Sequence, residues 1–255
     1  MRRRGWNATE SLSIADAEEL LATSRAWTAD VLERVSPRLP EGDEPLRILE
    51  IGSAQGRTLL SLAEVGHEAC GIEPHVPAIE VAHELAARHG AAIDVREGRA
   101  EAIPYDDAEF DVVLAFAVME HVVDLHESLN EIHRVLKPGG VFWFSSASAM
   151  CWRQNEIGRF PMFGWYPDRL KRRIMRWAVE NKPEIIGHTG TPAVWWWTPR
   201  RAHRWLEAAG FVDIVDRWQM RPGIPPIVKR SSVLRAAGDV VMPGCSYAAT
   251  KPKLA

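Results

Sequence analysis

Hydrophobic and polar positions alternate in two ways along the first 150 residues, as short apolar runs and as stretches with helical spacing. Apolar runs of roughly 4–8 residues bounded by turn residues are typical of buried strands. The runs that we interpret as strands are RILEIG, EACGIEP, AIDVREG, FDVVLAF and VFWFSS. Helical stretches separate them, so the pattern predicts an α/β protein in which right-handed crossovers join parallel strands and helices cover both faces of the sheet.

The predicted helices carry end signals. A helix over residues 13–35 is expected to begin with a capping box, in which Ser13 is the N-cap and Asp16 lies three residues later. Gly90 is a candidate C′ residue after VPAIEVAHELAARHG, and Pro138 with two glycines is expected to stop the helix HESLNEIHRVLKPGG.

The rhythm changes after the fifth predicted strand. Thr198 as N-cap, Pro199 at the first helical position and Gly210 at the end predict a late helix. FVDIVDRW and SYAATKPK are interpreted as the last two strands, and the Pro-rich segment 221–244 between them is expected to be irregular. We therefore expect one domain with four parts: a helical arm (1–45), a core (46–148), an aromatic and basic insert (149–197) and a C-terminal part (198–255).

The stretch ILEIGSAQGRT is a strand that runs into a glycine turn and then a helix. Such a turn lets backbone approach a ligand closely, beside the free N–H groups of the helix. A dinucleotide-binding loop would have glycine at positions 52, 54 and 57, where this chain has Gly52, Ala54 and Arg57. A tighter loop, an acid followed by three alternate glycines, matches better with Glu50 and Gly56, although Ala54 would resist a positive φ.

This tighter loop resembles the first motif of the class I S-adenosylmethionine-dependent methyltransferases, and further motifs follow in order. Glu73 in GIEPH matches the acid that pairs with the ribose hydroxyls, and Ala100 and Glu101 in GRAEAIPY match the stretch that flanks the adenine. FDVVLAFAVMEHVVD and LNEIHRVLKPGGVFWFS match the ubiquinone-biosynthesis-like branch, methyltransferase type 11. The resemblance covers residues 46–148 well and 198–251 more loosely.

The resemblance implies a Rossmann-like, doubly wound, mostly parallel seven-stranded sheet with an antiparallel last strand, and S-adenosyl-L-methionine as cofactor. The residues predicted to bind the cofactor are Glu50, Gly52, Ala54, Gln55, Gly56, Glu73, Pro74, Ala100, Glu101, Ala115 and Phe116. Each has an alternative: Glu50 could be an isolated strand acid, Glu73 a helix cap and Glu101 a solvated turn acid. Phe116 could belong to the core.

Methyl transfer depends mainly on aligning the nucleophile with the sulfonium methyl group, and a base is needed only if the nucleophile must lose a proton. His121 is the candidate base because it follows the fourth strand, at the carboxyl edge where ligands bind, and because imidazole titrates near neutrality. Alternatively, His121 only packs at the start of the next helix. Glu120 is the neighbouring alternative base, and the weaker candidates are Tyr166, Asp168 and His188.

The substrate class follows partly from motifs that are missing. The segment after the fourth strand reads AFAVMEH, without the Asn/Asp-Pro-Pro-aromatic motif of methyltransferases that act on exocyclic amines of nucleobases. Cytosine-C5 methyltransferases need a Pro-Cys nucleophile, and no cysteine here follows a proline. A small-molecule acceptor at O, N or C therefore remains. FPMFGWY and AVWWW either line an apolar acceptor pocket or form the core of the insert, and Trp27 is expected to close the same pocket.

The run RLKRRIMR, with Leu170, Ile174 and Trp177 as an expected apolar stripe, is interpreted as a solvated helix face. It leaves open a surface for RNA or for an acidic acceptor. A methyltransferase acting on RNA or protein is therefore one alternative function, and a cofactor-binding module without chemistry is another.

Charge and cysteine content limit the partners, the metal sites and the cellular compartment that we expect. The net charge of −3 gives no global attraction to nucleic acid, and we expect none as a partner. Cys70, Cys151 and Cys245 form neither a disulfide framework nor a CxxC pair, so we expect no metal site. The basic start lacks the apolar run of a secretory signal, and no segment is long enough to span a bilayer. We expect a cytoplasmic protein without a membrane partner, and the oligomeric state stays open.

Overall fold

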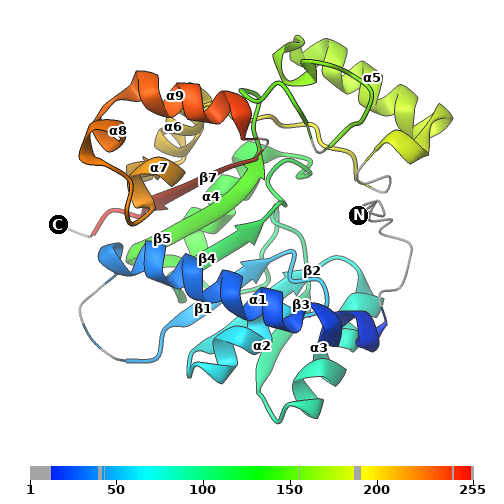
Figure 1. Cartoon of the computed structure of the whole chain (residues 1–255). Coiled ribbons are helices and arrows are strands. Elements are labelled where there is room, and N and C mark those ends of the chain that lie inside the picture. The colour runs from blue at the N-terminus through cyan, green and yellow to red at the C-terminus, as the bar shows by residue number, and fades with distance from the viewer. Residues whose placement is uncertain are drawn as a thin grey trace.

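The computed structural model describes residues 13–39, 42, 44–154, 156–186, 191–242 and 244–253. Seven strands form one sheet in the order β3-β2-β1-β4-β5-β7-β6 (Figure 1). The strands are β1 (Arg47–Ile51), β2 (Glu68–Glu73), β3 (Ile93–Glu97), β4 (Phe110–Phe116), β5 (Leu136–Ala147), β6 (Val212–Asp216) and β7 (Gly244–Thr250). β1 to β5 pair in parallel, and β7 is antiparallel to both β5 and β6. The predicted fold class is confirmed.

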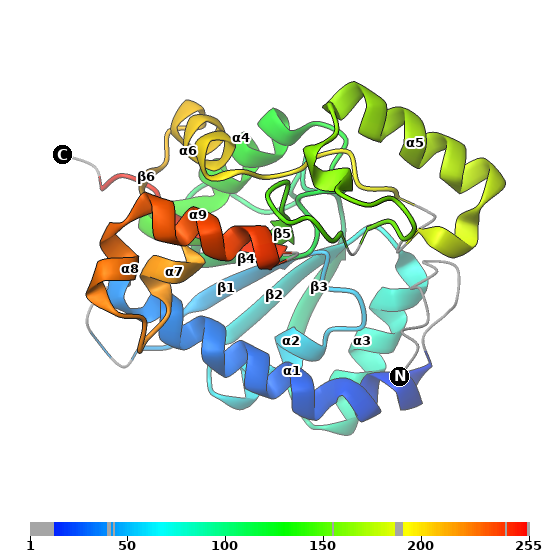
Figure 2. The same ribbon diagram turned by 45° about the horizontal axis from the view of Figure 1, so that its top comes forward.

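Helices cover both faces of this sheet. They are α1 (Ile14–Val35), α2 (Arg57–Glu64), α3 (Val76–Arg88), α4 (Leu125–Val135), α5 (Asp168–Asn181), α6 (Pro199–Ala208), α7 (Arg217–Met220), α8 (Pro226–Arg230) and α9 (Ser232–Val241), with 3₁₀ turns η1 (Ser36–Arg38), η2 (Phe163–Trp165) and η3 (Pro183–Ile185). Figure 2 shows α1, α2 and α3 on one face and α4 and α6 on the other. Within the described chain, no helix is long and apolar enough to cross a bilayer.

The predicted helix ends are confirmed at three places. Ser13 and Asp16 form the capping box of α1. Gly90 has a φ of +65°, directly after the C-cap of α3. The Thr198 hydroxyl accepts a hydrogen bond from the Arg201 N–H, as an N-cap does.

The expectation that residues 221–244 are irregular is wrong, because this segment contains α8 and α9. Pro226 is the first residue of α8, where the missing N–H of proline costs nothing. Ser231 caps α9 by accepting from the N–H of Leu234. These short helices complete the layer beside β6 and β7.

One predicted helix end is also wrong. α4 ends at Val135, and Leu136 is already extended and pairs with Phe110 as the start of β5. Pro138 and its glycines therefore lie inside the strand, where Gly139 has a φ of +84° and the register of β5 against β4 shifts. A β-bulge tolerates proline and glycine that a regular central strand would not.

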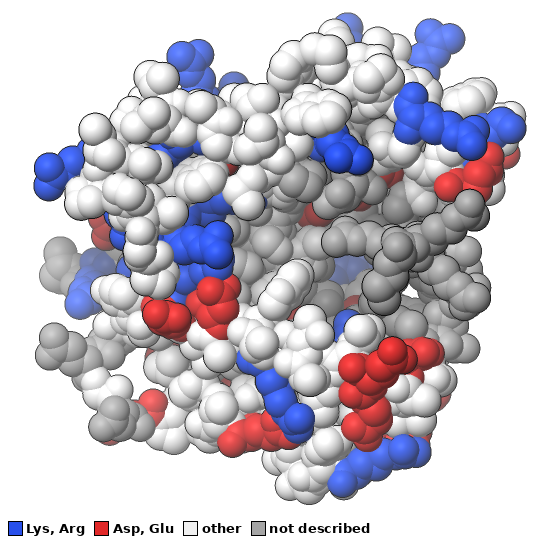
Figure 3. All heavy atoms as spheres, in the orientation of Figure 1, with Lys and Arg blue, Asp and Glu red and all other residues white. Residues whose placement is uncertain are grey.

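Ile174 packs against the core of the insert as expected, but the rest of the apolar stripe expected on α5 is wrong. Its buried residues are Lys171, Met175 and Ala178, whereas Leu170 and Trp177 are 43% and 46% exposed. The Lys171 ammonium is accommodated because it lies 2.9 Å from a carboxylate oxygen of Asp168 and 4.3 Å from the ring centroid of Trp196. Lys and Arg side chains gather on the outer side of α5 (Figure 3, upper right). Arg169, Arg173 and Arg176 of the basic run are exposed, so the solvated face is confirmed for them and not for Lys171.

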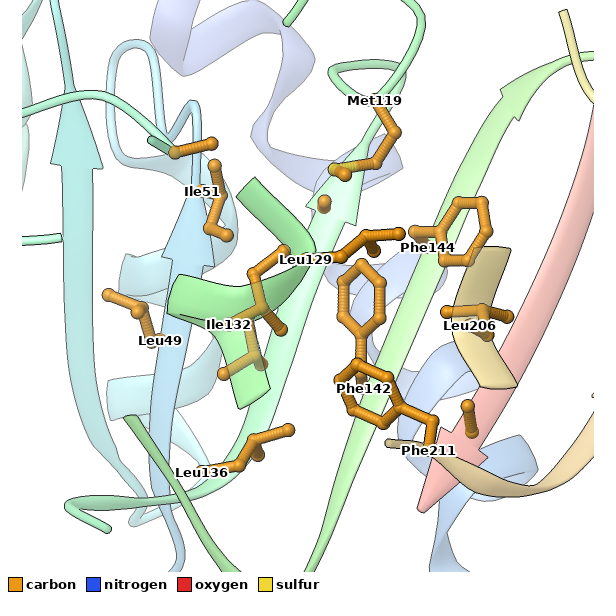
Figure 4. Close-up of a cluster of buried hydrophobic side chains, with 14 of the residues drawn as sticks. Leu49, Ile51, Met119, Leu129, Ile132, Leu136, Phe142, Phe144, Leu206 and Phe211 are labelled. Carbon is orange, nitrogen blue, oxygen red and sulfur yellow. The ribbon is translucent and has the colours of Figure 1, made fainter. Parts of the chain in front are cut away.

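The core lies on both faces of the sheet, because successive side chains of a strand point to opposite faces. In β4, Val113 and Ala115 belong to the cluster on the α4 side, and Val112 and Leu114 to the cluster on the α1 side. Figure 4 shows the α4-side cluster, where Phe142 of β5 lies among side chains from α4 and α6. Burial on both faces explains why the strands read as nearly continuous apolar runs.

Candidate active site

The glycine loop, residues 52–56, joins β1 to α2 with three residues in the left-handed region. The φ angles are +70° for Gly52, +47° for Ala54 and +68° for Gly56. A Cβ atom on Gly52 would lie 2.6 Å from a methyl carbon of Val118, and one on Gly56 would lie 2.7 Å from the Cβ of Ala82. Both glycines are therefore required by conformation and by space, and Ala54 adopts the positive φ that its side chain resists.

Polar atoms around this loop are buried without partners. The side chains of Glu50, Ser53 and Gln55 are at most 5% exposed. Among the described residues, one carboxylate oxygen of Glu50, the Ser53 hydroxyl and the Gln55 amide oxygen make no hydrogen bond. Burial raises the pKa of Glu50 to about 8. Such atoms cost free energy unless a ligand supplies hydrogen bonds, and the ammonium group of a methionine moiety suits a buried carboxylate.

Glu73 stands at the end of β2, beside the glycine loop. Its two carboxylate oxygens accept hydrogen bonds from the N–H groups of Ala54 and His75, each at 3.0 Å. Burial raises the pKa of Glu73, and these two hydrogen bonds oppose the rise. A carboxylate oxygen can accept two hydrogen bonds, so Glu73 retains capacity for the two hydroxyls of a ribose. Pro74, which follows it, is exposed.

The stretch predicted to flank the adenine, residues 98–105, follows β3 and is hydrogen-bonded to the turn before α4. Ala100 is buried and Glu101 is half-buried. One Glu101 carboxylate oxygen accepts from the N–H groups of Val123 and Asp124, at 2.7 and 3.2 Å. Glu101 therefore holds the turn that leads into α4, and its role toward adenine stays a prediction.

Ala115 and Phe116 lie at the carboxyl end of β4 on opposite faces. Ala115 is fully buried. The Phe116 ring centroid is 5.0 Å from that of Trp143 and 6.2 Å from that of Trp27, on which it stacks. Phe116 thus packs partly as core. It also brings Trp27 of α1, which is 62% exposed, to the end of β4.

A second polar cluster follows β4. The Nε2 atom of His121 lies 3.9 Å from a carboxylate oxygen of Glu156, and a Glu120 carboxylate oxygen accepts from the Ser146 hydroxyl at 2.7 Å. Burial lowers the pKa of His121 and raises the pKa values of Glu120 and Glu156, each to about 7. Glu156 escaped the sequence analysis because no spacing relates it to His121, 35 residues earlier.

The insert, residues 149–197, leaves the sheet and returns to it at one point. The Ala149 N–H donates to the Trp197 carbonyl at 2.7 Å, and the Trp197 N–H donates to the Ala147 carbonyl at 3.0 Å. Within the insert, the Val194 N–H donates to the carbonyl of Glu120 at 2.8 Å. The insert is therefore hydrogen-bonded to the turn after β4, at the same carboxyl edge as the glycine loop.

The indole rings of Trp196 and Trp197 do not line a pocket. The prediction that AVWWW lines an acceptor pocket is therefore wrong for these two residues. Both are fully buried. The Trp196 ring packs 5.9 Å from Phe163 in the core of the insert, and the Trp197 ring packs 4.6 Å from Phe144 in the main core. The alternative, that these aromatics are core, holds here.

The weaker catalytic candidates lie within the insert. The Tyr166 ring packs 5.7 Å from the Phe163 ring. Asp168 pairs with Lys171 and with Arg201, whose Nη2 lies 2.8 Å away. His188 lies outside the described residues. Tyr166 and Asp168 therefore serve the packing of the insert and its attachment to α6.

A surface hollow of about 710 Å³ lies elsewhere, between α6 and α9. It is lined by Pro199, Arg200, His203, Arg204, Glu207, Ala208, Ser232 and Arg235. None of the predicted site residues lines it, so it does not belong to the glycine-loop site.

Comparison with known proteins agrees with this geometry. Residues 49–144 match the family model described as a methyltransferase domain. The ubiquinone biosynthesis O-methyltransferase of Methylobacterium nodulans is 33% identical over 133 residues, 51% of this chain and 53% of that protein. That of Maricaulis maris is 35% identical over 127 residues, 49% of this chain and 50% of that protein. The chain thus spans about half the length of these curated relatives.

Solved structures share the fold over nearly the whole chain. An S-adenosylmethionine-dependent methyltransferase from Mesorhizobium loti has a TM-score of 0.59 at 18% identity, covering 91% of this chain and all of that one. The fold is thus the one found in S-adenosylmethionine-dependent methyltransferases, and the segment that matches a methyltransferase domain contains the glycine loop. Over about half of its length, the chain is similar to the ubiquinone biosynthesis O-methyltransferases.

Proposed function

We propose that this chain transfers the methyl group of S-adenosylmethionine to an O, N or C nucleophile of a small, partly apolar molecule. The observation that carries the proposal is the set of buried, unpartnered polar atoms on Glu50, Ser53 and Gln55, next to a loop whose glycines leave room for a ligand. When bound, the cofactor supplies a methyl group attached to a sulfonium sulfur, and this sulfur is a good leaving group.

The chain's own residues would bind and orient the reactants. Glu50 would accept from the amino group of the methionine part, and Glu73 from the ribose hydroxyls. Gly52, Gln55 and Gly56 would let the backbone approach, with Ala54 and Pro74 on the same edge. The further predicted contacts are Ala100, Glu101, Ala115 and Phe116.

His121 would act as the general base where the acceptor carries a proton. On taking up the methyl group, with the sulfur left as a neutral thioether, the acceptor oxygen or nitrogen would give up its proton. The acceptor's proton moves to His121, so atoms and charge balance. Burial lowers the pKa of His121, which keeps the imidazole neutral and able to accept a proton at pH 7.

We propose a division of labour along the chain, in which residues 46–148 hold the cofactor and the insert covers the acceptor. The hydrogen bond from the insert to Glu120 supports this division, because it places the insert over the turn that carries His121. Trp27 of α1, stacked beside the same edge, would close the acceptor site from the other side. The buried free thiols of Cys70, Cys151 and Cys245 fit a reducing compartment such as the cytoplasm.

Calorimetry tests the proposal directly. We expect S-adenosylmethionine and its demethylated product to bind and NAD not to bind. Binding of NAD together with no response to either sulfur compound would overturn it. Salt-dependent retention on RNA would instead favour a macromolecular acceptor, and turnover of none of a broad panel of hydroxylated aromatics and amines would favour a binding module.

A further inference from the structure

Three titratable side chains lie together where the insert meets the turn after β4. Glu120 and His121 come from the turn after β4, and Glu156 comes from the insert. The side chains of His121 and Glu156 are only 12% and 14% exposed, and Glu120 is 2% exposed. Buried carboxylates next to an imidazole are costly unless their charges compensate each other, so this cluster calls for an explanation.

The insert holds His121 from two sides. Glu156 lies 3.9 Å from Nε2, and the backbone at Thr191 and Pro192 makes hydrogen bonds that favour the protonated ring. Next to this contact, the Trp195 indole N–H donates to the Val122 carbonyl at 2.9 Å. Two separate segments of the insert, around residues 156 and 191–195, therefore meet on one imidazole.

The charges at this contact act in a definite direction. A carboxylate near an imidazole stabilises the imidazolium form, whereas burial destabilises it. Here burial lowers the pKa of His121 and Glu156 opposes that effect. In return, His121 lowers the pKa of Glu156, which burial and the neighbouring Glu120 raise. The contact therefore couples the protonation of the two residues.

We propose that Glu156 is a positioning residue for His121: its carboxylate orients the imidazole and stabilises the imidazolium that forms when the acceptor's proton is transferred. The base is then complete only with the insert in place, so that acceptor binding under the insert and proton removal are linked. This inference rests on the proposed function, in which His121 accepts the proton. At 3.9 Å the contact is longer than a direct hydrogen bond, and it acts through charge.

Other titratable groups border the cluster, among the residues that the structure describes. Glu120 faces Glu156 and accepts from the Ser146 hydroxyl. On the far side of Glu120, burial raises the pKa of the Cys245 thiol of β7 and keeps it neutral. Glu120 and Glu156 are thus the groups whose charge can change near His121 around neutral pH.

The test is the titration of the His121 ring by NMR in the full-length protein, with the signal assigned from its loss in His121→Gln. In Glu156→Gln we expect the His121 pKa to fall by about one pH unit or more, the effect of removing one carboxylate at this distance. Glu184→Gln is the matched control, because Glu184 is an exposed acid of the same insert. We expect it to leave the His121 titration unchanged.

An unchanged His121 titration in Glu156→Gln, or the same change in Glu184→Gln, would overturn the inference. If Glu156→Gln does not fold, the reciprocal experiment decides: in His121→Gln the Glu156 carboxyl, followed by its ¹³C shift, must titrate at higher pH. An unchanged Glu156 titration there would also overturn it. Failure of cofactor binding in wild-type calorimetry would instead count against the proposed function, so the two failures are distinct.

Discussion

Glu50 provides a prediction that can be worked through from its burial. Burial raises its pKa in the folded protein from the usual 4.5 to about 8. Well below pH 4.5 the carboxyl is protonated in both the folded and the unfolded chain, so its burial does not lower the free energy of unfolding. As the pH rises toward 8, the unfolded chain loses the proton first. The stability present at low pH is therefore lost as the pH rises through the folded-state pKa.

The size of this effect follows from the two pKa values. The difference between 8 and 4.5 corresponds to at most about 5 kcal/mol, at about 1.36 kcal/mol per pH unit. Glu50→Gln removes the titration and keeps the shape of the side chain. We therefore expect this variant to gain stability relative to wild type by up to about 3 kcal/mol between pH 5.5 and 7.5.

Urea unfolding of both proteins across pH 5 to 8.5 measures this difference, and Glu68→Gln, at an exposed acid of β2, is the control. Glu120 and Glu156 act on both proteins alike, so the comparison isolates Glu50. Saturating S-adenosylhomocysteine should flatten the wild-type curve, because its amino group would pair with the Glu50 carboxylate. A difference in the free energy of unfolding that does not vary with pH would refute the reasoning.

Ala54→Gly should raise the free energy of unfolding by roughly 0.5–1 kcal/mol, because relief of the positive φ outweighs the added chain entropy; a loss measured by urea unfolding would contradict this. Gly56→Ala should lower it by about 2 kcal/mol or more, since its Cβ would clash with Ala82, and a neutral result would show that the loop can shift. Glu73→Ala should weaken cofactor binding by roughly 10- to 100-fold in calorimetry, equivalent to about 1.5–3 kcal/mol; unchanged affinity in a folded variant would move the ribose elsewhere. Trp197→Ala should lower the free energy of unfolding by about 3–5 kcal/mol, and a variant that loses acceptor turnover without this loss would return the ring to the acceptor site.

Much of the fold could be predicted from local patterns. Apolar runs and helical spacing located all seven strands, because burial on both faces leaves a short continuous apolar run for each central strand. End signals such as Ser13 and Thr198 located helix ends, because caps satisfy backbone groups within a few residues. Where tertiary contacts outweighed the local pattern, prediction failed: Leu136 pairs with Phe110 and so ends α4 before Pro138.

The candidate site divides in the same way. The glycine loop and Glu73 could be predicted because the carboxyl ends of parallel strands meet at one edge, so residues at strand ends become neighbours whatever the loops do. The face that α5 buries depends instead on its partners, and Asp168 and the Trp196 ring allow Lys171 to be buried there. The contact between His121 and Glu156 likewise follows from how the insert returns to the sheet, which no spacing along the chain encodes. The sequence by itself determined the sheet and the edge that carries the glycine loop. Only the tertiary structure decided what lies against His121, because the insert is positioned by long-range hydrogen bonds and core packing rather than by strand order.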